Sequence, residues 1–539
     1  MSIAEPPQAG AAELSRADGG PMPVEPGSRH VTTVVAAFWD AVRDVPDRTA
    51  LDDGRRRLSY RQYGRAVAAL ADRLAVHGVA GRRVLVALPN GIECAVATFA
   101  ALSAGAQVAF VNPAYPEPEL TPQIRAAAPV VAVTGASAAV PSAVATAHGV
   151  PVVVLGPEAV EDLLACAPVA PPRAPAPEAA ATLMFTGGTT GVAKAVPRDH
   201  RALLLTVQGM EACWPTTRGA ETWLNVAPMF HIWGALMGLF NPAYRAATLV
   251  VVPRFEPGAV VAALSAHRVT VFGGGPAAIY AALLAAPTLP DADLSALRVC
   301  PGGGSSFAEG LLERWERRTG VPVHEAFGMT ELAPISCNPP GRPPRPGTVG
   351  TPAPLVSVRV ADLDDPAQTL PVGEIGEVLV AGPHALKGYL DAPEESAATV
   401  VEGWVRTGDI GRMDAEGNLT IVDRKKDMLL VGGFNVYPRE IDEALARHPG
   451  VAESATIGVP DERKGERPLS FVVPVGDALL DPALLRAHCT ASLVGYKQPV
   501  EIVVVPALPR TAANKIDRRA LRAGWRRAPD PQETGVSGV

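Results

Sequence analysis

Short apolar runs recur through the first half of this sequence, and a glycine, proline or threonine ends or follows each of them. Apolar runs without polar alternation are typical of strands that are buried on both faces, as in a parallel sheet. Helical patterns lie between them, and in one of these Tyr63, Val67, Leu70 and Leu74 share a single helix face. The alternation predicts a large α/β body with strands at residues 84–88, 130–134, 152–155, 183–185, 249–252 and 269–272.

The sequence pattern changes beyond about residue 358. Shorter strand signals separated by glycines follow, which indicates a β-rich subdomain of antiparallel strands. After Lys426, a strand-like segment, a Gly-Gly turn and a helix with Pro438 at its first position predict a compact α+β unit. We therefore expect a domain boundary near residues 423–427.

Composition excludes several classes of protein. The 539 residues include 48 Lys and Arg against 55 Asp and Glu, a net charge of −7 without a basic cluster, which argues against a nucleic-acid partner. No apolar stretch approaches the roughly 18 residues that predict a membrane span. The six cysteines are scattered without a C-x-x-C pair, so we expect free thiols in a cytoplasmic protein. Residues 1–26, rich in Pro, Gly and Ala, predict a disordered tail.

The strongest local signal is LMFTGGTTGVAKAV, residues 183–196, in which an apolar strand runs into a loop of glycines, threonines and one lysine. Glycines allow backbone N–H groups to approach an anion, threonine hydroxyls add donors, and the lysine supplies a positive charge. A hydroxyl-rich turn after a strand is the plainer interpretation, but such a turn does not require this many glycines and threonines. We predict phosphate binding by Thr186, Gly187, Gly188, Thr189, Thr190, Gly191 and Lys194.

Two further segments, CPGGGSS at residues 300–306 and HEAFGMTE at residues 324–331, follow strand-like runs. The carboxyl ends of parallel strands are where α/β sheets bind ligands. Phe327 is suited to stack on a base, Thr330 to donate to a phosphate and Glu331 to hold Mg²⁺. Glu331 taken alone fits a carboxylate at a helix start equally well.

A third segment, RTGDIGRMDAEGNLTIVDRKKD, covers residues 406–427. Asp409 beside Gly408 suits hydrogen bonding to two vicinal sugar hydroxyls, and Arg424 suits a ribose or phosphate oxygen. Charged runs of this kind are more often solvated turns. This segment therefore indicates a binding site only in combination with the other segments.

Eight motifs occur in order from about residue 32 to about residue 522: TGGTTGVAK, PMFHIWG, GGGSS, FGMTE, WVRTGDIG, DRKKD, GGFNVYPREIDEAL and LPRTAANKIDRRAL. In this combination the chain resembles the adenylate-forming superfamily of acyl-CoA synthetases, aryl-acid ligases, luciferases and peptide-synthetase adenylation domains, most closely the acyl-CoA ligases. The resemblance implies an α/β fold, with an N-terminal body of two α/β subdomains plus a β-rich subdomain at residues 27–424. A hinge at 425–427 and a small α+β C-terminal lid domain at 428–539, which rotates about the hinge, are also implied.

The resemblance implies an activity as well. ATP and a carboxylic acid form an acyl-adenylate and pyrophosphate, and the thiol of CoA then displaces AMP, so the expected ligands are ATP, Mg²⁺ and CoA. Residues 186–194 hold the leaving pyrophosphate, Thr330 contacts the α-phosphate and Glu331 holds Mg²⁺. Lys515 reaches the acyl carboxylate and the phosphate, although a solvated lysine is the plainer interpretation. The same resemblance assigns the binding of adenine and ribose to Gly302, Gly303, Gly304, Phe327, Asp409 and Arg424.

The second half-reaction is expected in the C-terminal domain. Lys426 occupies the hinge position, and rotation replaces Lys515 at the site by the GGFNVYP loop. This loop favours free CoA over a tethered carrier, because a glycine lets the pantetheine arm pass close to the backbone. The expected CoA-binding residues are Gly432, Gly433, Phe434, Arg463 and Lys464, although Arg463 and Lys464 also fit a solvated loop.

The resemblance places the acyl pocket at three segments, residues 231–234, residues 272–276 and residues 302–306. Glycines replace residues that are often bulkier in the second segment, and a pocket wall without side chains leaves room. This predicts a large, mostly apolar acid, whether polycyclic, aryl or medium- to long-chain. His231 is expected to gate the pocket, and it fits a core histidine equally well. The predicted lining is His231, Ile232, Trp233, Gly273, Gly274 and Gly275.

Three positions depart from the family pattern: Ala195, Phe327 and Asn514 stand for the usual Gly, Tyr and Gly. Two of them lie in adenylation motifs, which leads to the hypothesis of a ligase with weak adenylation that converts a preformed acyl-adenylate, supplied by a partner adenylating enzyme. Three competing hypotheses are an acyl-AMP ligase that loads a carrier protein, an inactive acyl-nucleotide binding protein and a luciferase-like oxidative enzyme. The sequence leaves a homodimer open.

Overall fold

The computed structural model describes residues 31–167, 170–186, 193–307, 309–338, 341–461, 463–476, 478–511 and 516–525, and the predicted tail at 1–26 lies outside them. The described chain forms two compact units. The first comprises the residues up to 359 with 379–407 and 415–419, and the second comprises 360–378, 408–414 and the residues from 420 onward. The predicted fold class, a large α/β body followed by a smaller α+β part, is confirmed. The predicted domain limits and the rotation stay predictions.

The first unit contains a six-stranded sheet in the order β6–β5–β3–β4–β7–β8. The first five strands run parallel, and β8 pairs antiparallel with β7. Four of the predicted apolar runs form strands here, and in three of them buried side chains explain the absence of polar alternation, whereas Val154 in the run at 152–155 is 52 % exposed. The strands are β3 (Arg83–Ala87), β4 (Gln107–Phe110), β5 (Val131–Thr134), β6 (Val152–Val154), β7 (Ala180–Thr186) and β8 (Lys194–Asp199).

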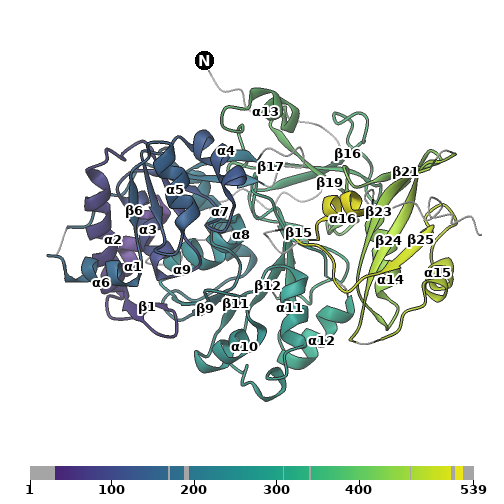
Figure 1. Cartoon of the computed structure of the whole chain (residues 1–539), viewed down its shortest axis with the longest axis horizontal. Helices are drawn as coiled ribbons and strands as arrows, with labels where there is room; N and C mark the ends of the chain where they lie inside the picture. The colour runs from purple at the N-terminus through teal and green to yellow at the C-terminus, as the bar shows by residue number, and fades with distance from the viewer. Residues whose placement is uncertain are drawn as a thin grey trace, which may run out of the picture. The chain divides into compact units, whose positions relative to one another are not determined.

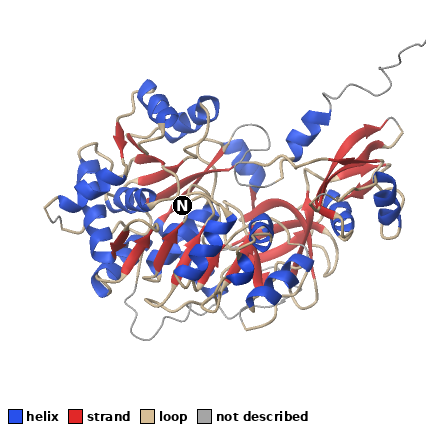
Figure 2. Ribbon diagram, turned by 60° about the horizontal axis from the view of Figure 1, so that its bottom comes forward, coloured by secondary structure: helices blue, strands red, loops and turns tan. Residues whose placement is uncertain are grey.

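Four helices connect successive parallel strands of this sheet, and three more precede or follow it in the chain (helices in blue, strands in red in Figure 2). The predicted face of one of them is buried, with Tyr63, Val67, Leu70 and Leu74 each at most 3 % exposed. This helix begins after Ser59, whose side chain accepts from the Gln62 N–H in a capping box. The helices are α1 (Val34–Asp44), α2 (Tyr60–Ala75), α3 (Ile92–Ser103), α4 (Glu117–Ala127), α5 (Ala139–Ala147), α6 (Pro157–Ala165) and α7 (His200–Cys213).

Two further sheets belong to the first unit, in the orders β11–β9–β10–β1–β2 and β12–β13–β14–β15. The other two predicted runs lie in β10 and β11. The strands are β1 (Thr49–Asp52), β2 (Arg57–Ser59), β9 (Thr222–Asn225), β10 (Thr248–Val251), β11 (Val271–Gly273), β12 (Cys300–Gly303), β13 (Val323–Phe327), β14 (Ser336–Cys337) and β15 (Thr351–Pro352). The helices are α8 (Ile232–Ala235), α9 (Asn241–Tyr244), α10 (Pro257–Ala266), α11 (Ala277–Leu284), α12 (Glu309–Thr319) and α13 (Pro393–Thr399), with a π turn at Leu236–Phe240 and a 3₁₀ turn at Leu289–Asp291.

Five further strands follow residue 356, where the sequence predicts antiparallel strands, and Val400–Val401 pairs antiparallel with the strand that begins at Trp404. They are β16 (Ser357–Ala361), β17 (Gly376–Ala381), β18 (Val400–Val401), β19 (Trp404–Met413) and β20 (Leu419–Arg424). The chain passes from one unit to the other within β16, β17, β19 and β20, so the division between the units does not fall at a single linker.

The second unit is built on a sheet in the order β22–β21–β24–β23, with β25 beside β24, shown in yellow-green in Figure 1. Ile441 and Leu445 of α14 and Leu485 of α15 pack in one buried cluster with residues of this sheet. Pro438 begins α14, as predicted. The elements are β21 (Leu429–Val431), β22 (Phe434–Val436), α14 (Pro438–Ala446), β23 (Val451–Asp461), β24 (Gly465–Pro474), α15 (Pro482–Thr490), β25 (Glu501–Val504) and α16 (Arg518–Trp525).

The state of the cysteines agrees with the sequence, which predicts free thiols. All six cysteines are free, and five are buried while Cys166 is partly exposed. Among the helices of the described residues, none is both long enough and apolar enough to cross a membrane.

Candidate functional site

The two ends of the predicted phosphate loop are held by a strand pair. Thr186 ends β7 and Lys194 begins β8, and the two residues are register partners in the antiparallel ladder. The Thr186 hydroxyl donates to the Lys194 carbonyl at 3.5 Å. The rest of the predicted phosphate-binding set lies outside the described residues: Gly187, Gly188, Thr189, Thr190 and Gly191.

Glu331 lies in the turn after β13 and is only 6 % exposed. Its carboxylate Oε1 accepts a 2.7 Å hydrogen bond from the hydroxyl of Tyr389. Its backbone carbonyl accepts a second bond, at 2.8 Å, from the N–H of Leu386. Within the described residues, no lysine, arginine or histidine nitrogen forms an ion pair with this carboxylate at 4.0 Å or less. A neutral donor, rather than a cation, therefore holds the carboxylate directly.

Arg198, on β8, is bonded to the same turn. Its guanidinium donates to the Thr330 carbonyl at 2.5 Å and to the Thr206 hydroxyl at 2.7 Å. Burial lowers the pKa of Arg198 to about 10, and the charge of Glu331 opposes that shift. Arg198 thus remains a cation at neutral pH and offsets the charge of Glu331 at longer range.

A cavity of about 250 Å³ borders Arg198, Glu331 and His384. The His384 side chain is buried, and neither ring nitrogen has a hydrogen-bond partner among the described residues. Burial lowers the pKa of His384 to about 4, and the Arg198 charge adds to the shift. The imidazole is therefore neutral at pH 7.

Tyr389 also contacts Lys194. The Lys194 ammonium lies 4.9 Å from the centre of the Tyr389 ring, a cation–π distance, and Tyr389 is 8 % exposed. The next residue, Leu390, donates its N–H to the Ala195 carbonyl at 2.9 Å. One short segment, residues 386–390, therefore contacts both the start of β8 and the turn that carries Glu331.

The residues predicted to flank adenine lie on neighbouring strands. Gly302 and Gly303 belong to β12 and Phe327 ends β13, which runs parallel to it. Gly304 follows with φ +81°, a conformation that favours glycine. The Gly303 N–H donates to the Gly275 carbonyl at 3.1 Å, so the predicted adenine and acyl segments adjoin.

The indole of Trp233 lies against the predicted acyl-pocket glycines. A Cβ atom at Gly275 would lie 3.2 Å from Trp233 Nε1, and one at Gly303 would lie 3.1 Å from the indole ring. Trp233 Nε1 donates to the Gly273 carbonyl at 3.4 Å. His231 and Ile232 precede it at the start of α8 and are partly exposed. The structure thus brings the three predicted pocket segments together.

Gly273 and Gly274 do not leave the room that the sequence predicts. A Cβ atom at Gly273 would lie 2.9 Å from Met237 Cβ, and one at Gly274 would lie 2.6 Å from Phe272 Cε1. Neighbouring side chains already pack against both glycines, so the interpretation of the missing side chains as open space is wrong at these two positions.

Asp409 and Arg424 lie in the second unit and form a pair there. Arg424 Nε donates to Asp409 Oδ1 at 3.1 Å. Asp409 is 5 % exposed, whereas the Arg424 side chain is 52 % exposed. Lys426 lies in the turn after β20, where burial and then the charge of Arg424 lower its pKa. The hinge role of Lys426 stays a prediction.

The predicted CoA-binding glycines form the turn between β21 and β22. Gly432 and Gly433 have φ values of +59° and +85°, in the left-handed region that favours glycine. The Gly432 N–H donates to the Lys464 carbonyl at 2.8 Å, which places the glycine turn beside the charged turn at residues 463–464. Phe434 is 55 % exposed and stacks on Tyr496 with ring centres 4.6 Å apart.

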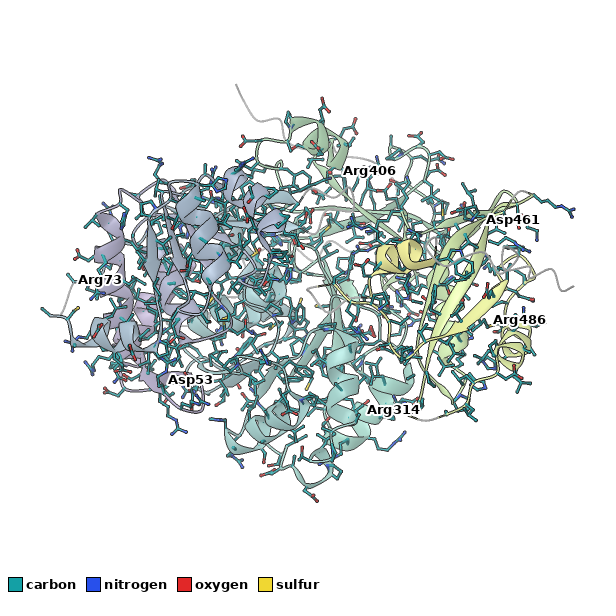
Figure 3. The ribbon with its side chains drawn as sticks, in the orientation of Figure 1. Asp53, Arg73, Arg314, Arg406, Asp461 and Arg486 are labelled. Atoms are coloured by element: carbon teal, nitrogen blue, oxygen red, sulfur yellow. The ribbon has the colours of Figure 1, made fainter. Side chains whose placement is uncertain are left out.

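The charged turn is shaped by Asp461, which is labelled in Figure 3. Its carboxylate accepts from the N–H groups of Arg463 and Lys464 at 3.0 and 2.9 Å. It also pairs with Arg467 at 2.6 Å. Both Arg463 and Lys464 remain exposed. Lys515 and Asn514 lie outside the described residues.

Comparison with known families covers both parts of the chain. Residues 38–390 match the AMP-binding enzyme family, and residues 440–515 match the AMP-binding enzyme C-terminal domain. The chain belongs to the AMP-binding enzyme family. Its predicted membership of the adenylate-forming superfamily is thereby confirmed.

Relatives of this AMP-binding enzyme match it over nearly its whole length. A long-chain-fatty-acid–CoA ligase of Bacillus subtilis (strain 168) is 32 % identical over 532 residues, 91 % of this chain and 94 % of the relative. A methyl-dioxo-octahydro-indenyl-propanoyl:CoA ligase of Mycobacterium tuberculosis is 36 % identical and covers 91 % and 98 %. The ATP-bound structure of MatB from Rhodopseudomonas palustris superposes with a TM-score of 0.86 at 29 % identity, covering 92 % and 99 %. The predicted enzyme class, an acid–thiol ligase, is confirmed.

The described residues of this AMP-binding enzyme fit a magnesium ion that arrives with a nucleotide. They contain no group of three or more His, Cys, Asp and Glu that would hold a metal. Mg²⁺ commonly takes one or two protein carboxylates and completes its shell with substrate phosphates and water. Glu331 is a single buried carboxylate without a cation bonded to it, which suits that shared coordination.

Sequence reasoning misses three residues of the site: Arg198, His384 and Tyr389. Each lies in a segment with no glycine-rich loop, no motif and no periodicity that points to a ligand. Their place beside Glu331 follows from tertiary packing, so no local signal in the sequence finds them.

Proposed function

We propose that this family member is an AMP-forming acyl-CoA ligase that activates a bulky, mostly apolar carboxylic acid with Mg²⁺ and ATP. The observation that carries the proposal is that Tyr389 contacts both Lys194 and Glu331 in the first unit, while Arg198 is bonded to the Thr330 carbonyl next to Glu331. A lysine at the end of a glycine- and threonine-rich loop and a nearby carboxylate without a bonded cation are the groups that a triphosphate and its metal ion need.

In the first half-reaction the acid's carboxylate oxygen attacks the α-phosphorus, and the bond to pyrophosphate breaks. Lys194 and the loop it closes would hold the leaving pyrophosphate, and Thr330 would contact the α-phosphate. Glu331 would hold Mg²⁺, which when bound neutralises phosphate charge. Lys515 would bind the acid and phosphate oxygens, and Asp409 with Arg424 would bind the ribose. Positioning and charge stabilisation account for most of the rate enhancement in such reactions.

In the second half-reaction the sulfur of CoA attacks the acyl carbon and AMP leaves. The left-handed glycines Gly432 and Gly433 support the passage of a narrow pantetheine arm along the backbone. Arg463 and Lys464 lie beside that turn with exposed side chains, where they would meet the CoA phosphates. This arrangement favours CoA over a tethered carrier protein.

Two observations support a bulky, apolar acid. The relatives named above carry the names of a long-chain fatty acid and of a fused-ring propanoate, both large and mostly apolar. The predicted pocket is lined by an indole rather than by a charged group, because Trp233 lies against Gly275 and Gly303. An apolar wall of this kind binds the hydrocarbon part of the acid and disfavours a second charged group there, such as the distal carboxylate of malonate. In this proposal Trp233, rather than the glycines, sets the size of the acid that the pocket accepts.

The test is a panel of carboxylic acids offered to the full-length protein with ATP, Mg²⁺ and CoA. The panel spans acetate, malonate, benzoates, long-chain fatty acids and fused-ring propanoates, and mass spectrometry detects CoA thioesters. We expect thioesters of the large apolar acids and none of malonate. Turnover of acetate or malonate alone would contradict the acid class, and no thioester with any acid would contradict the ligase.

The same panel separates the competing hypotheses. Thioesters formed only from synthetic acyl-adenylates would indicate a ligase with weak adenylation, and transfer to a carrier protein in preference to CoA would indicate an acyl-AMP ligase. Trp233→Ala should extend the accepted acids to larger ones, while Trp39→Ala, a partly buried indole bonded to Ser103, should leave the preference unchanged. If Trp233→Ala and the unmodified protein accept the same acids, Trp233 does not line the acyl pocket.

A further inference from the structure

We propose that Tyr389 is a positioning residue that fixes the Glu331 carboxylate and the Lys194 ammonium relative to each other for a metal-bound triphosphate. This inference rests on the proposed function of Lys194 and Glu331. It adds a residue that lies outside all eight sequence motifs. It follows from two contacts of one side chain, the 2.7 Å hydrogen bond to Glu331 and the 4.9 Å ring contact to Lys194.

The hydrogen bond assigns different tasks to the two oxygens of Glu331. Oε1 accepts from the Tyr389 hydroxyl, so the rotation of the carboxylate is restricted and Oε2 is the oxygen left for a metal ion. Partners that orient a ligating carboxylate in this way are commonly needed for full metal affinity. Burial, followed by the charge of Glu331, raises the pKa of the Tyr389 phenol, so the hydroxyl stays protonated and remains a donor throughout the neutral range.

The ring contact restricts the other partner. Lys194 has four rotatable side-chain bonds, and the face of the Tyr389 ring attracts its ammonium group. A lysine held in this way meets a phosphate with less loss of side-chain entropy than a free one. The same aromatic ring therefore reduces the ordering cost of the lysine while its hydroxyl orients the carboxylate.

Tyr389 itself is held on both sides. The backbone N–H of Leu386 donates to the Glu331 carbonyl at 2.8 Å, and that of Leu390 donates to the Ala195 carbonyl at 2.9 Å. The Tyr389 N–H donates to the Ser396 hydroxyl at 2.8 Å. Because these bonds come from the backbone, the loss of the Tyr389 hydroxyl leaves the segment in place, and a Phe variant tests the hydroxyl alone.

The experiment compares Tyr389→Phe with Tyr60→Phe in the full-length protein. Tyr60 is the matched control, because its buried hydroxyl also donates a 2.7 Å hydrogen bond, to the Ala247 carbonyl, with the Pro242 carbonyl as a more distant acceptor at 3.4 Å. Mn²⁺ is titrated, with a non-hydrolysable ATP analogue present, and free Mn²⁺ is measured by electron paramagnetic resonance. We expect Tyr389→Phe to weaken Mn²⁺ binding about tenfold and Tyr60→Phe to leave it unchanged.

A second variant separates the ring from the hydroxyl. Tyr389→Leu removes both contacts, so it should weaken Mn²⁺ binding as Tyr389→Phe does and should also weaken binding of the analogue without metal, which Tyr389→Phe should not do. Mn²⁺ affinity in Tyr389→Phe within twofold of the unmodified protein would overturn the inference. The same loss in Tyr60→Phe would overturn it too, since a general loss of packing would then explain both.

These outcomes are distinct from a failure of the proposed function. If the unmodified protein binds no Mn²⁺ with the analogue and releases no pyrophosphate with any acid, the function fails and the inference fails with it. If the unmodified protein does both and Tyr389→Phe matches it, only the positioning role of Tyr389 is lost.

Discussion

Two buried carboxylates, Glu331 in the first unit and Asp409 in the second, are held in opposite ways. Both are nearly inaccessible, at 6 % and 5 % exposure. Asp409 accepts from the guanidinium of Arg424, whereas Glu331 accepts from the neutral hydroxyl of Tyr389. Burial of a carboxylate without a bonded cation is costly, so proteins keep such groups where a cation arrives from outside. Under the proposed function, the comparison separates a carboxylate that would bind a metal ion from one that would bind sugar hydroxyls.

The largest expected effect comes from removal of the charge of Glu331. Glu331→Gln keeps the size of the side chain and an oxygen that accepts from Tyr389, so it removes little except the negative charge. Pyrophosphate release with ATP, Mg²⁺ and a matched acid should fall about 100- to 1,000-fold. Conversion of a synthetic acyl-adenylate to the thioester should change less than about threefold, because the triphosphate has already left.

The control for this variant is Glu178→Gln, an exposed carboxylate of the same unit that pairs with Arg201. It should keep the full rate of pyrophosphate release. Equal losses in both half-reactions of Glu331→Gln would mean that the charge supports the fold rather than a metal ion.

A smaller effect is expected at Asp409, since it acts on binding and its charge is already paired. Asp409→Asn weakens the hydrogen bonds that the carboxylate accepts, which are worth about 1.5 to 3 kcal/mol when one partner is charged. The KM for ATP should rise about tenfold or more, with kcat changed much less. Steady-state kinetics at several Mg²⁺ concentrations measure this, and the Mg²⁺ requirement should be unaltered. Asp364→Asn, exposed in the same unit, is the control. If Asp409→Asn changed the Mg²⁺ concentration that the enzyme requires, Asp409 and Glu331 would not differ in their relation to the metal ion.

The smallest effect is expected from protonation of His384 beside Glu331. Its pKa is lowered by burial to about 4, while the unfolded chain has the ordinary value near 6.5. The unfolded state binds the proton first as the pH falls, so the stability is present above pH 6.5 and is lost progressively down to about pH 4. Between pH 6.5 and 5.5 this histidine should reduce the free energy of unfolding by about 1 kcal/mol.

Urea unfolding at the two pH values, followed by tryptophan fluorescence, measures this change. Six of the seven tryptophans lie in the first unit, so their signal reports mainly on the unfolding of the unit that contains His384. His384→Gln should remove about 1 kcal/mol of the decrease. The partly exposed His77, replaced by Gln, serves as the control. An unchanged pH dependence in His384→Gln would show that the imidazole is not held neutral.

The sequence predicts six strands of the first unit from their apolar runs, but the fully buried β4 in the same sheet is missed because its run is short and begins with Gln107. Strand β7 is an instructive exception in its limits. The run at residues 183–185 marks only its centre, and the strand begins at Ala180, where Thr182 is buried without being apolar. The glycine turn at Gly432 and Gly433 is equally predictable, because its positive φ values need glycine.

The sequence does not reveal the partners of the site residues. Tyr389 and Arg198 meet the Thr330–Glu331 turn through contacts between segments that are far apart in the chain, and no local pattern encodes such a meeting. Gly273 shows the converse error. The absence of a side chain there is visible in the sequence, but Met237, which occupies the space, is not adjacent to it in the chain. A missing side chain therefore predicts room only when the neighbours in space are known.

The backbone bonds of residues 386–390 to Ala195 and to Glu331 bear on how such enzymes recombine. A crossover between residues 199 and 384 would join a β8 and loop from one parent to a 386–390 segment from another. Lys194, Glu331 and Tyr389 would then not all come from the same parent enzyme, so evolution would not have selected their contacts together. Breakpoints outside residues 183–390 avoid this mismatch. A hybrid ligase should therefore take this whole segment from one parent enzyme.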